Sequence, residues 1–332
     1  AVWISSLSLL LLYVFTHFGE SVLQAMYYFF RDLRIAEITS LGNGVYRVFI
    51  QSQVFSIIFG FLLLSFTTFT KDRRRLMLLL SLIIATVILA LSRSFWVGLV
   101  PSIAFLLVLL WKQIRPTLTQ SLRFVGMSLS VLVLALLLIG TVILFPLPSQ
   151  DLTGSDLVLT LKDRTTDSDD VAISSRWKLL TPMINKIFEN PLTGHGFGSS
   201  VTFTTDDPRV REIHPDGSWT TSSMEWGWFE LWIKMGILGP VAFLYAAYEL
   251  LKRLWAYRWT EHAWLGFGLM TGLVFIFATH FFSPYLNHPI GLGYLLFLVP
   301  FLPTKKPAEA VAGIHLPNIL VSKEVPVMAS EQ

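Results

Sequence analysis

The sequence predicts an all-α protein, a polytopic membrane helical bundle with one large extracytoplasmic loop. Two features of composition favour this fold class: 53% of the 332 residues are hydrophobic and only 14% are charged, whereas an average soluble domain carries about 25% charged residues. The third observation is the arrangement, because the apolar residues stand in long runs separated by short charged clusters. Disorder, collagen-like repeats and soluble nucleic-acid binding are excluded.

Charge and cysteine content narrow the function classes further. A net charge of +3 is too small to indicate an anionic polymer, so no nucleic-acid partner is expected. The chain has no cysteine, which excludes disulfide frameworks, thiolate metal sites and cysteine nucleophiles. Paired metal-ligand spacing, a P-loop and a nucleophile elbow are absent from the sequence, so neither a metal nor another cofactor is expected. Because it begins with Ala1, the chain is interpreted as a fragment or a processed product.

Eight apolar segments are predicted to be membrane helices, at residues 2–18, 49–70, 76–91, 95–110, 125–146, 226–251, 263–282 and 289–302. The first lacks the basic start and the small-residue cleavage site of a signal peptide, so it is interpreted as a span. The third, fourth and last are shorter than the ideal of about 20 residues. Ser92-Arg93-Ser94 is expected to form the tight tip of a helical hairpin, where a charge can face a wet cavity.

Lysine and arginine in the short loops predict the orientation of the chain. Basic clusters occupy alternate loops, at 71–75, 112–123, 252–258 and 305–306. A single threading therefore puts all of them in the cytoplasm. The loops that then fall outside are 19–48, 92–94, 147–225 and 283–288.

The predicted organisation has four parts: transmembrane helices at 1–146, an extracytoplasmic loop with short helices at 147–225, transmembrane helices at 226–303 and a disordered cytoplasmic tail at 304–332. The loop is 79 residues long and holds 12 acidic against 7 basic residues. Loops longer than about 12–15 residues are usually functional or disordered. Chemistry is therefore expected in this loop.

The second half of the loop is predicted to be the better organised, whereas its acidic, Ser/Thr-rich start at 149–170 is expected to be mobile. Residues 176–180 predict a short helix, and Thr181-Pro182 supplies an N-cap and a first-turn proline for a second one that Pro191 ends. Apolar side chains at helical spacing are expected to lie on a membrane face: Trp177, Leu180, Ile184, Ile187 and Phe188. The glycine-rich segment 194–198 predicts a tight turn that could present N–H groups to an anion.

Three arginines on the predicted outer face are candidates for binding a diphosphate, since a guanidinium fork suits its oxygens. They are Arg93 at the hairpin tip, Arg176 in the large loop and Arg47 at the outer edge of the second span. Lipid head-group anchoring or a structural ion pair is the alternative for each.

Glu225 is the first candidate for a general base that removes a proton from a sugar hydroxyl. It is predicted to open the helix that carries Trp226, and Ser222-x-x-Glu225 equally matches a capping box. His214 in the large loop is the second candidate. His195, His280 and His288 are further alternatives, each also explained as a surface or interfacial histidine.

Taken together, these residues resemble the O-antigen ligase and O-antigen polymerase superfamily over the C-terminal two-thirds of the chain. The resemblance rests on the order of four short motifs: Ser92-Arg93-Ser94-Phe95-Trp96, Arg176-Trp177, Asn190-Pro191-Leu192-x-Gly194-x-Gly196-x-Gly198 and Gly236-Ile237-Leu238-Gly239. It implies a GT-C-like fold and a location in the bacterial inner membrane. Family members have more spans, so the chain would lack part of the N-terminal half.

The resemblance also implies an activity: inverting, metal-independent transfer of a glycan from undecaprenyl diphosphate to a glycan or lipid acceptor outside the cytoplasm. Arg93 and Arg176 match the arginines that bind the diphosphate. Where the family has an activating histidine, eleven residues before Gly236, this chain has Glu225. Either Glu225 or His214 is then the base, or the chain is a divergent member, and both polymerase and ligase fit.

Two other function classes compete with an enzyme. A transporter or flippase of lipid-linked glycans would also place charge at membrane depth, but such folds often show repeated halves, and no internal repeat is found. A structural membrane scaffold would leave the large loop unexplained.

Overall fold

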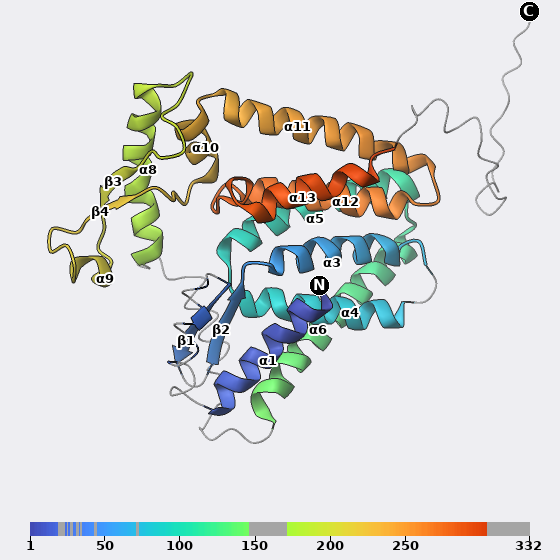
Figure 1. Ribbon diagram of the computed structural model, residues 1–332. Coiled ribbons are helices and arrows are strands. Elements are labelled where there is room, and N and C mark those ends of the chain that lie inside the picture. The colour runs from blue at the N-terminus through green and yellow to red at the C-terminus, as the bar shows by residue number, and fades with distance from the viewer. Residues whose placement is uncertain are drawn as a thin grey trace, which may run out of the picture. The chain divides into compact units, whose positions relative to one another are not determined.

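The computed structural model describes residues 1–18, 35–42, 45–70, 73–145 and 171–303, with isolated positions between 24 and 33. The predicted mobile start of the large loop, at 149–170, and the predicted tail at 304–332 lie outside these residues. Up to Leu302 the chain forms one unit, and its elements are labelled in Figure 1.

A helix occupies each segment that the apolar runs single out. The apolar helices are α1 (Val2–Phe18), α3 (Gln53–Thr67), α4 (Arg74–Ala90), α5 (Arg93–Ile114), α6 (Leu118–Leu144), α10 (Gly227–Met235), α11 (Leu238–Leu254), α12 (Ala263–Thr279) and α13 (Pro289–Leu298). Short 3-10 turns follow or precede them: η1 (Trp255–Trp259), η2 (Tyr285–Asn287) and η3 (Val299–Phe301). The large loop contributes α8 (Val171–Glu189) and α9 (Pro208–Arg211).

Among the described residues, two helices are long and apolar enough to cross a membrane: α5, over Arg93–Gln113, and α6, over Leu118–Leu144. Helix α5 extends beyond the predicted segment 95–110 at both ends, whereas α6 starts before the predicted segment 125–146 and ends two residues short of it. For α6 the reason is a capping box, in which Thr117 and Gln120 exchange hydrogen bonds and start the helix early. The predicted span at 226–251 is not one continuous helix: α10 and α11 pass the same test only together, as a pair bent by 120°, which makes a third candidate span if the pair is one broken span.

The expectation of an all-α chain is confirmed only in part, since two antiparallel hairpins accompany the helices. Strands β1 (Ala36–Gly42) and β2 (Val45–Ile50) pair from Ala36↔Ile50 onward. Strands β3 (Val201–Thr204) and β4 (Ser218–Thr221) pair in the large loop. In β2 the side chains of Tyr46, Val48 and Ile50 are buried, which is the period-2 pattern of a strand with one covered face. The fold is therefore mostly helical.

Helix α12 forms the centre of the largest apolar core. It is buried along most of its length and packs against α3, α5 and α13, which run alongside it in Figure 1. Two glycines allow the close approach: a Cβ at Gly268 would lie 2.7 Å from Leu62 Cα, and one at Gly272 would lie 2.5 Å from the Tyr294 hydroxyl. Small residues at such crossings are typical of membrane helix packing.

The hairpin tip predicted at 92–94 is confirmed. Helix α4 ends at Ala90, Leu91 adopts a left-handed conformation with φ 43°, and α5 begins at Arg93. The hydroxyls of Ser92 and Ser94 share a buried hydrogen bond of 2.9 Å. The chain therefore reverses within three residues.

The loop helix differs from its prediction. Residues 171–189 form the single helix α8, with Pro182 inside it, so Thr181 is not an N-cap. The buried face consists of Leu179, Met183 and Ile187, which pack against β3 and α10. Of the predicted apolar stripe, Trp177 and Phe188 are exposed, because a different face of this helix packs against β3 and α10.

The bend between α10 and α11 depends on one glycine. Gly236 has φ +67°, and a Cβ there would lie 2.0 Å from the carbonyl oxygen of Leu192. We predict that Gly236→Ala lowers the free energy of unfolding by about 2–3 kcal/mol. Gly140→Ala in α6 is the matched control, because its Cβ would meet nothing within 4 Å and alanine favours a helix. Equal effects of the two variants, measured by unfolding in mixed micelles, would contradict this prediction.

Candidate functional site

The large loop is attached to the end of α10 by main-chain hydrogen bonds. The N–H groups of His195 and Gly196 donate to the carbonyls of Ile233 and Lys234, at 2.7 and 3.0 Å. The Ile237 N–H donates in turn to the carbonyl of Pro191 at 3.0 Å. We call the segment 190–196 the docking turn. It joins the motif after α8 to the glycine motif at the bend.

The docking turn does not bind an anion in the way its glycines suggest. A Cβ at Gly194, which has φ +70°, would lie 2.4 Å from the Gly236 nitrogen, so this glycine is needed for close packing. The N–H of Gly194 donates to Asn190, and those of the next two residues donate to α10. Because these donors are occupied by carbonyls, they are not available to a phosphate.

Arg176 and Glu225, which the sequence singles out separately, form an ion pair. The Arg176 Nε donates to Glu225 Oε2. Their side chains are 28% and 50% exposed, so a substrate can reach both. The indole N–H of Trp226 donates to the main-chain carbonyl of Arg176 at 2.8 Å, which fixes the two backbones beside each other.

Glu225 does not open a helix, as the sequence suggested. Helix α10 starts at Gly227, and Trp226 stands at its N-cap without a side-chain cap. The capping box with Ser222 is therefore not formed. The carboxylate lies just before the helix and faces α8 instead.

The second part of the candidate site lies at the tip between α4 and α5, where Arg47 contacts the end of α4. The Arg47 Nε donates to the carbonyl of Ala90 at 2.9 Å, and its Nη1 lies 3.1 Å from Glu37 Oε2. The guanidinium also lies 5.3 Å from the centre of the Phe49 ring. Strand β2 thus places Arg47 against the last residue of α4, three positions before Arg93.

One short segment, residues 280–285, connects the tip with the loop. From α5, Phe95 stacks on Tyr285 with ring centres 6.3 Å apart. From the loop side, Trp226 lies 5.1 Å from Phe282 and Trp228 lies 5.0 Å from His280. Arg93 is two residues before Phe95, and Glu225 directly precedes Trp226. The segment 280–285 therefore contacts a close sequence neighbour of each candidate, Phe95 for Arg93 and Trp226 for Glu225.

The four candidate histidines lie in different surroundings. His214 is exposed, its ring lies 6.4 Å from that of Trp219, and in the described part of the chain no hydrogen bond joins it to Arg176 or Glu225. The His195 ring is bonded to the Lys186 carbonyl at 2.7 Å. His280 and His288 each accept a main-chain N–H, from Leu286 and Ile290, so they stabilise turns.

Sequence reasoning missed a carboxylate that holds the loop to α8. Asp206, next to β3, is paired with Lys178 and Arg211. The hydrogen bond and charge of the Lys178 ammonium lower the pKa of this carboxyl, and Arg211 adds to the effect. Asp206 lies 28 residues from Lys178, so no local pattern indicates the pair.

A second ion pair, inside α10, is shielded from water. Glu230 and Lys234 are four residues apart, and their side chains are 3% and 11% exposed. Glu230 Oε2 also accepts the N–H of Met224 at 3.1 Å. The pair therefore ties the chain before α10 to the helix itself.

One comparison with known proteins finds a match. A family model described as O-antigen ligase matches residues 76–244. The chain belongs to the O-antigen ligase family. No curated protein and no solved structure matches the chain.

Membership in the O-antigen ligase family makes the protein a glycosyltransferase-type enzyme of surface-polysaccharide assembly and an integral membrane protein. The family implies lipid-linked glycan substrates. It favours an enzyme over the transporter and scaffold alternatives. The matched range begins in α4 and ends in α11, so it contains Arg93, Arg176, His214 and Glu225, whereas Arg47 precedes it.

We predict that Glu230→Gln destabilises the protein by about 3–5 kcal/mol, because it leaves the Lys234 ammonium buried without a counter-charge. The control is Glu249→Gln, whose partners Lys252 and Arg253 are both 60% exposed; a change within about 0.5 kcal/mol is expected there. Both are measured as free energies of unfolding in mixed micelles. Similar values for the two variants would refute the distinction.

Proposed function

We propose that the protein transfers a glycan from undecaprenyl diphosphate to a hydroxyl of a glycan or lipid acceptor, with inversion and without a metal. The reaction takes place outside the cytoplasm, on the face of the bacterial inner membrane that carries the loop 147–225. The observation that supports this most is the contact of Arg176 with Glu225. It joins a cation suited to the leaving group to a carboxylate suited to the incoming hydroxyl.

The proposed reaction is a single displacement. The acceptor oxygen attacks the anomeric carbon of the donor sugar as its proton moves to Glu225. The bond between that carbon and the diphosphate oxygen breaks, and the electron pair leaves with the lipid diphosphate. Negative charge develops on this leaving group, and fixed cations that face it stabilise the transition state.

The ion pair leaves atoms of both residues available, those of Arg176 for binding the diphosphate and those of Glu225 for accepting the proton of the hydroxyl. Its contact uses Nε of Arg176 and Oε2 of Glu225, and it is the one side-chain hydrogen bond of either residue among the described residues. The two Nη groups can then take diphosphate oxygens in a forked geometry, and Oε1 can accept the hydroxyl proton. The diphosphate of the glycan donor, bound at Arg176, and the base Glu225 are thereby held close to each other. This lowers the entropy cost of bringing the two substrates together.

In this proposal Arg93 is the second cation that binds the diphosphate, after Arg176. Arg47 lies beside the hairpin tip that carries Arg93. Support comes from the segment 280–285, which aromatic contacts of Phe95 border on one side and those of Trp226 on the other. A diphosphate over this segment would lie between Arg93 and Arg176. Arg47, bonded to Glu37 and to Ala90, acts at longer range.

His214 is the alternative base. Its exposed position in the turn between α9 and β4 leaves the ring accessible to a large acceptor. To act as the base, His214 would have to move to the place beside Arg176 that the Glu225 carboxylate already occupies. The geometry therefore favours Glu225.

We predict that Arg93→Ala and Arg176→Ala each lower the rate of transfer from a lipid-diphosphate donor by about 10²–10³-fold, the usual effect of removing one transition-state donor. Arg211→Ala is the matched control, because it removes an exposed loop arginine that pairs with Asp206; near wild-type transfer is expected. The rate is measured with purified protein as the consumption of the lipid-linked glycan donor. Full activity of both site variants would overturn the proposed diphosphate site.

The base is identified by a second set of variants. Glu225→Gln keeps the shape and removes the proton acceptor, so transfer should fall by at least about 100-fold, while His214→Ala should retain it. Glu225→His introduces an imidazole at the position where the family carries one, and partial activity with a changed pH profile is expected. If His214→Ala is inactive and Glu225→Gln is active, the roles are reversed.

The orientation is tested with single cysteines, since the chain has none of its own. Glu212→Cys lies in the large loop and Glu261→Cys lies in the link between α11 and α12, and both positions are exposed. In intact cells, an impermeant maleimide should label the first variant at once and the second only after permeabilisation. The reverse labelling would invert the proposed topology.

A further inference from the structure

Two adjoining cavities open between α5 and α6. One, of about 330 Å³, lies where the chain turns from α5 into α6. The other, of about 390 Å³, extends from it between α3, α4, α5 and α6. They share Leu107, Phe124 and Met127, so they adjoin, and we call the pair the α5–α6 groove. Each is within the usual size of a small-molecule site, about 300–1,000 Å³.

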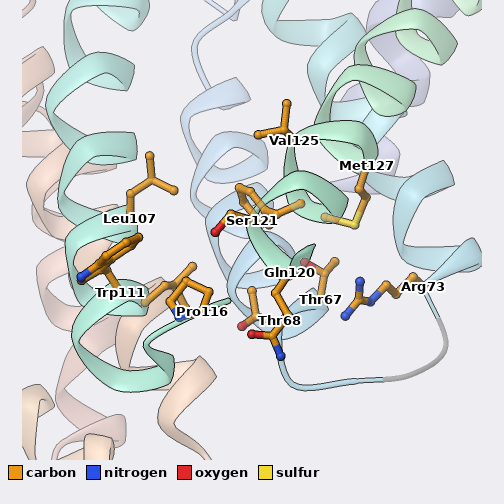
Figure 2. A pocket seen from close by; sticks show the side chains of 12 residues that line it. Thr67, Thr68, Arg73, Leu107, Trp111, Pro116, Gln120, Ser121, Val125 and Met127 are labelled. Carbon is orange, nitrogen blue, oxygen red and sulfur yellow. The ribbon is translucent and has the colours of Figure 1, made fainter. Parts of the chain in front are cut away.

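The α5–α6 groove is polar at its mouth and apolar inside. Figure 2 shows Arg73, Thr67, Thr68 and Gln120 gathered at one end, with Leu107, Val125 and Met127 beyond them. The second cavity is lined almost entirely by aliphatic and aromatic side chains, and its polar exception is Ser128. A ligand that fits must have a polar head and a hydrocarbon chain.

Two of the four polar side chains at the mouth, Arg73 and Gln120, have donors that suit an anion. The hydroxyls of Thr67 and Thr68 donate to carbonyls of their own helix, at 2.7 Å each. The Gln120 oxygen accepts the Thr117 N–H at 2.9 Å, which leaves the amide NH₂ of Gln120. The Arg73 side chain is exposed and has no partner among the described residues. A phosphate would accept hydrogen bonds from both the Arg73 guanidinium and the Gln120 amide NH₂.

The surroundings are strongly basic. Residues 71–123 contain eight lysines and arginines and one acid, Asp72. All of these cations except Arg93 fall in residues 71–75 and 112–123, on the links before α4 and after α5 or in the helix turns next to those links. Clusters of this kind beside membrane helices attract anionic lipid head groups.

We propose that the α5–α6 groove binds an anionic glycerophospholipid, with its phosphate at Arg73 and Gln120 and one acyl chain along the apolar part of the groove. The glycan donor is not the expected occupant. Eighteen residues of α5 separate Arg93 from Trp111 at the mouth, roughly 27 Å of helix, so the head groups of donor and phospholipid lie at opposite ends of this helix. The lipid site does not depend on the proposed reaction.

The test uses the purified chain in detergent and two matched pairs of variants. Arg73→Gln removes the cation at the mouth, and Arg74→Gln removes a neighbouring arginine that does not line the groove. Ser128→Phe fills the apolar part, and Ser130→Phe adds the same volume two residues away, at an exposed position outside the groove. Size-exclusion profiles identify any variant that misfolds.

Phosphatidylglycerol retention is measured by native mass spectrometry, and the midpoint of thermal unfolding is recorded with phosphatidylglycerol, phosphatidylcholine or inorganic phosphate. Wild type and both controls should keep one phosphatidylglycerol and be stabilised more by it than by the other two additives. Arg73→Gln should bind at least tenfold more weakly, and Ser128→Phe should lose the adduct.

Three results would overturn the proposal. Unchanged retention in both site variants would mean that the lipid binds elsewhere. An equal shift with inorganic phosphate would mean an ion site without a chain. Displacement of phosphatidylglycerol by substoichiometric undecaprenyl phosphate would identify an isoprenoid as the occupant. None of these results would bear on glycan transfer, which is assayed separately.

Discussion

The backbone contact between Gly194 and Gly236 is the constraint on which the proposed site depends. A Cβ on either residue would collide with main-chain atoms of the other segment, so the docking turn and the end of α10 meet without side chains between them. Since the docking turn directly follows α8, this contact fixes α8 beside α10. The Trp226 indole, bonded to the Arg176 carbonyl, then fixes the other ends of both elements. These two anchors bring the backbones of Arg176 and Glu225 close enough for their side chains to pair.

Apolar runs were sufficient to predict where the helices lie, because a helix that is apolar all round needs no finer pattern. They were insufficient where an apolar run changes its backbone conformation. Residues 45–50 alternate as a strand and lead into α3 within three residues, so hydropathy merges the two. Likewise Gly236-Ile237-Leu238-Gly239 continues the apolar run across the bend of 120°. The φ of +67° at Gly236 follows from the contact with Leu192, which lies 44 residues earlier in the sequence.

The candidate residues could be named from the sequence, but their partners could not. An arginine on an outer loop and a carboxylate before a tryptophan-rich helix are each chemically suggestive. Their pairing spans 49 residues and depends on the docking turn. Arg47 illustrates the same point, since its contact with Ala90 requires the β1–β2 hairpin, which no apolar run indicates. Conversely, the glycines of 194–198 suggested an anion cradle, but the N–H groups of 194–196 donate to main-chain carbonyls of Asn190 and α10.

Helix α5 connects the two proposed binding regions. Its first residue is Arg93, its Phe95 packs in the main core, and Leu99 and Ile103, one to two turns further, line the apolar groove. Beyond these residues, Leu107 and Trp111 lead to the mouth. A helix that leaves a cavity along one side forfeits dispersion contacts there, so an acyl chain in the groove would restore packing along the helix that positions Arg93. Occupancy of the groove would then stabilise the folded state by mass action, and α5 would serve the two proposed sites separately, with Arg93 at its first residue and Trp111 at the mouth of the groove, close to its last turn.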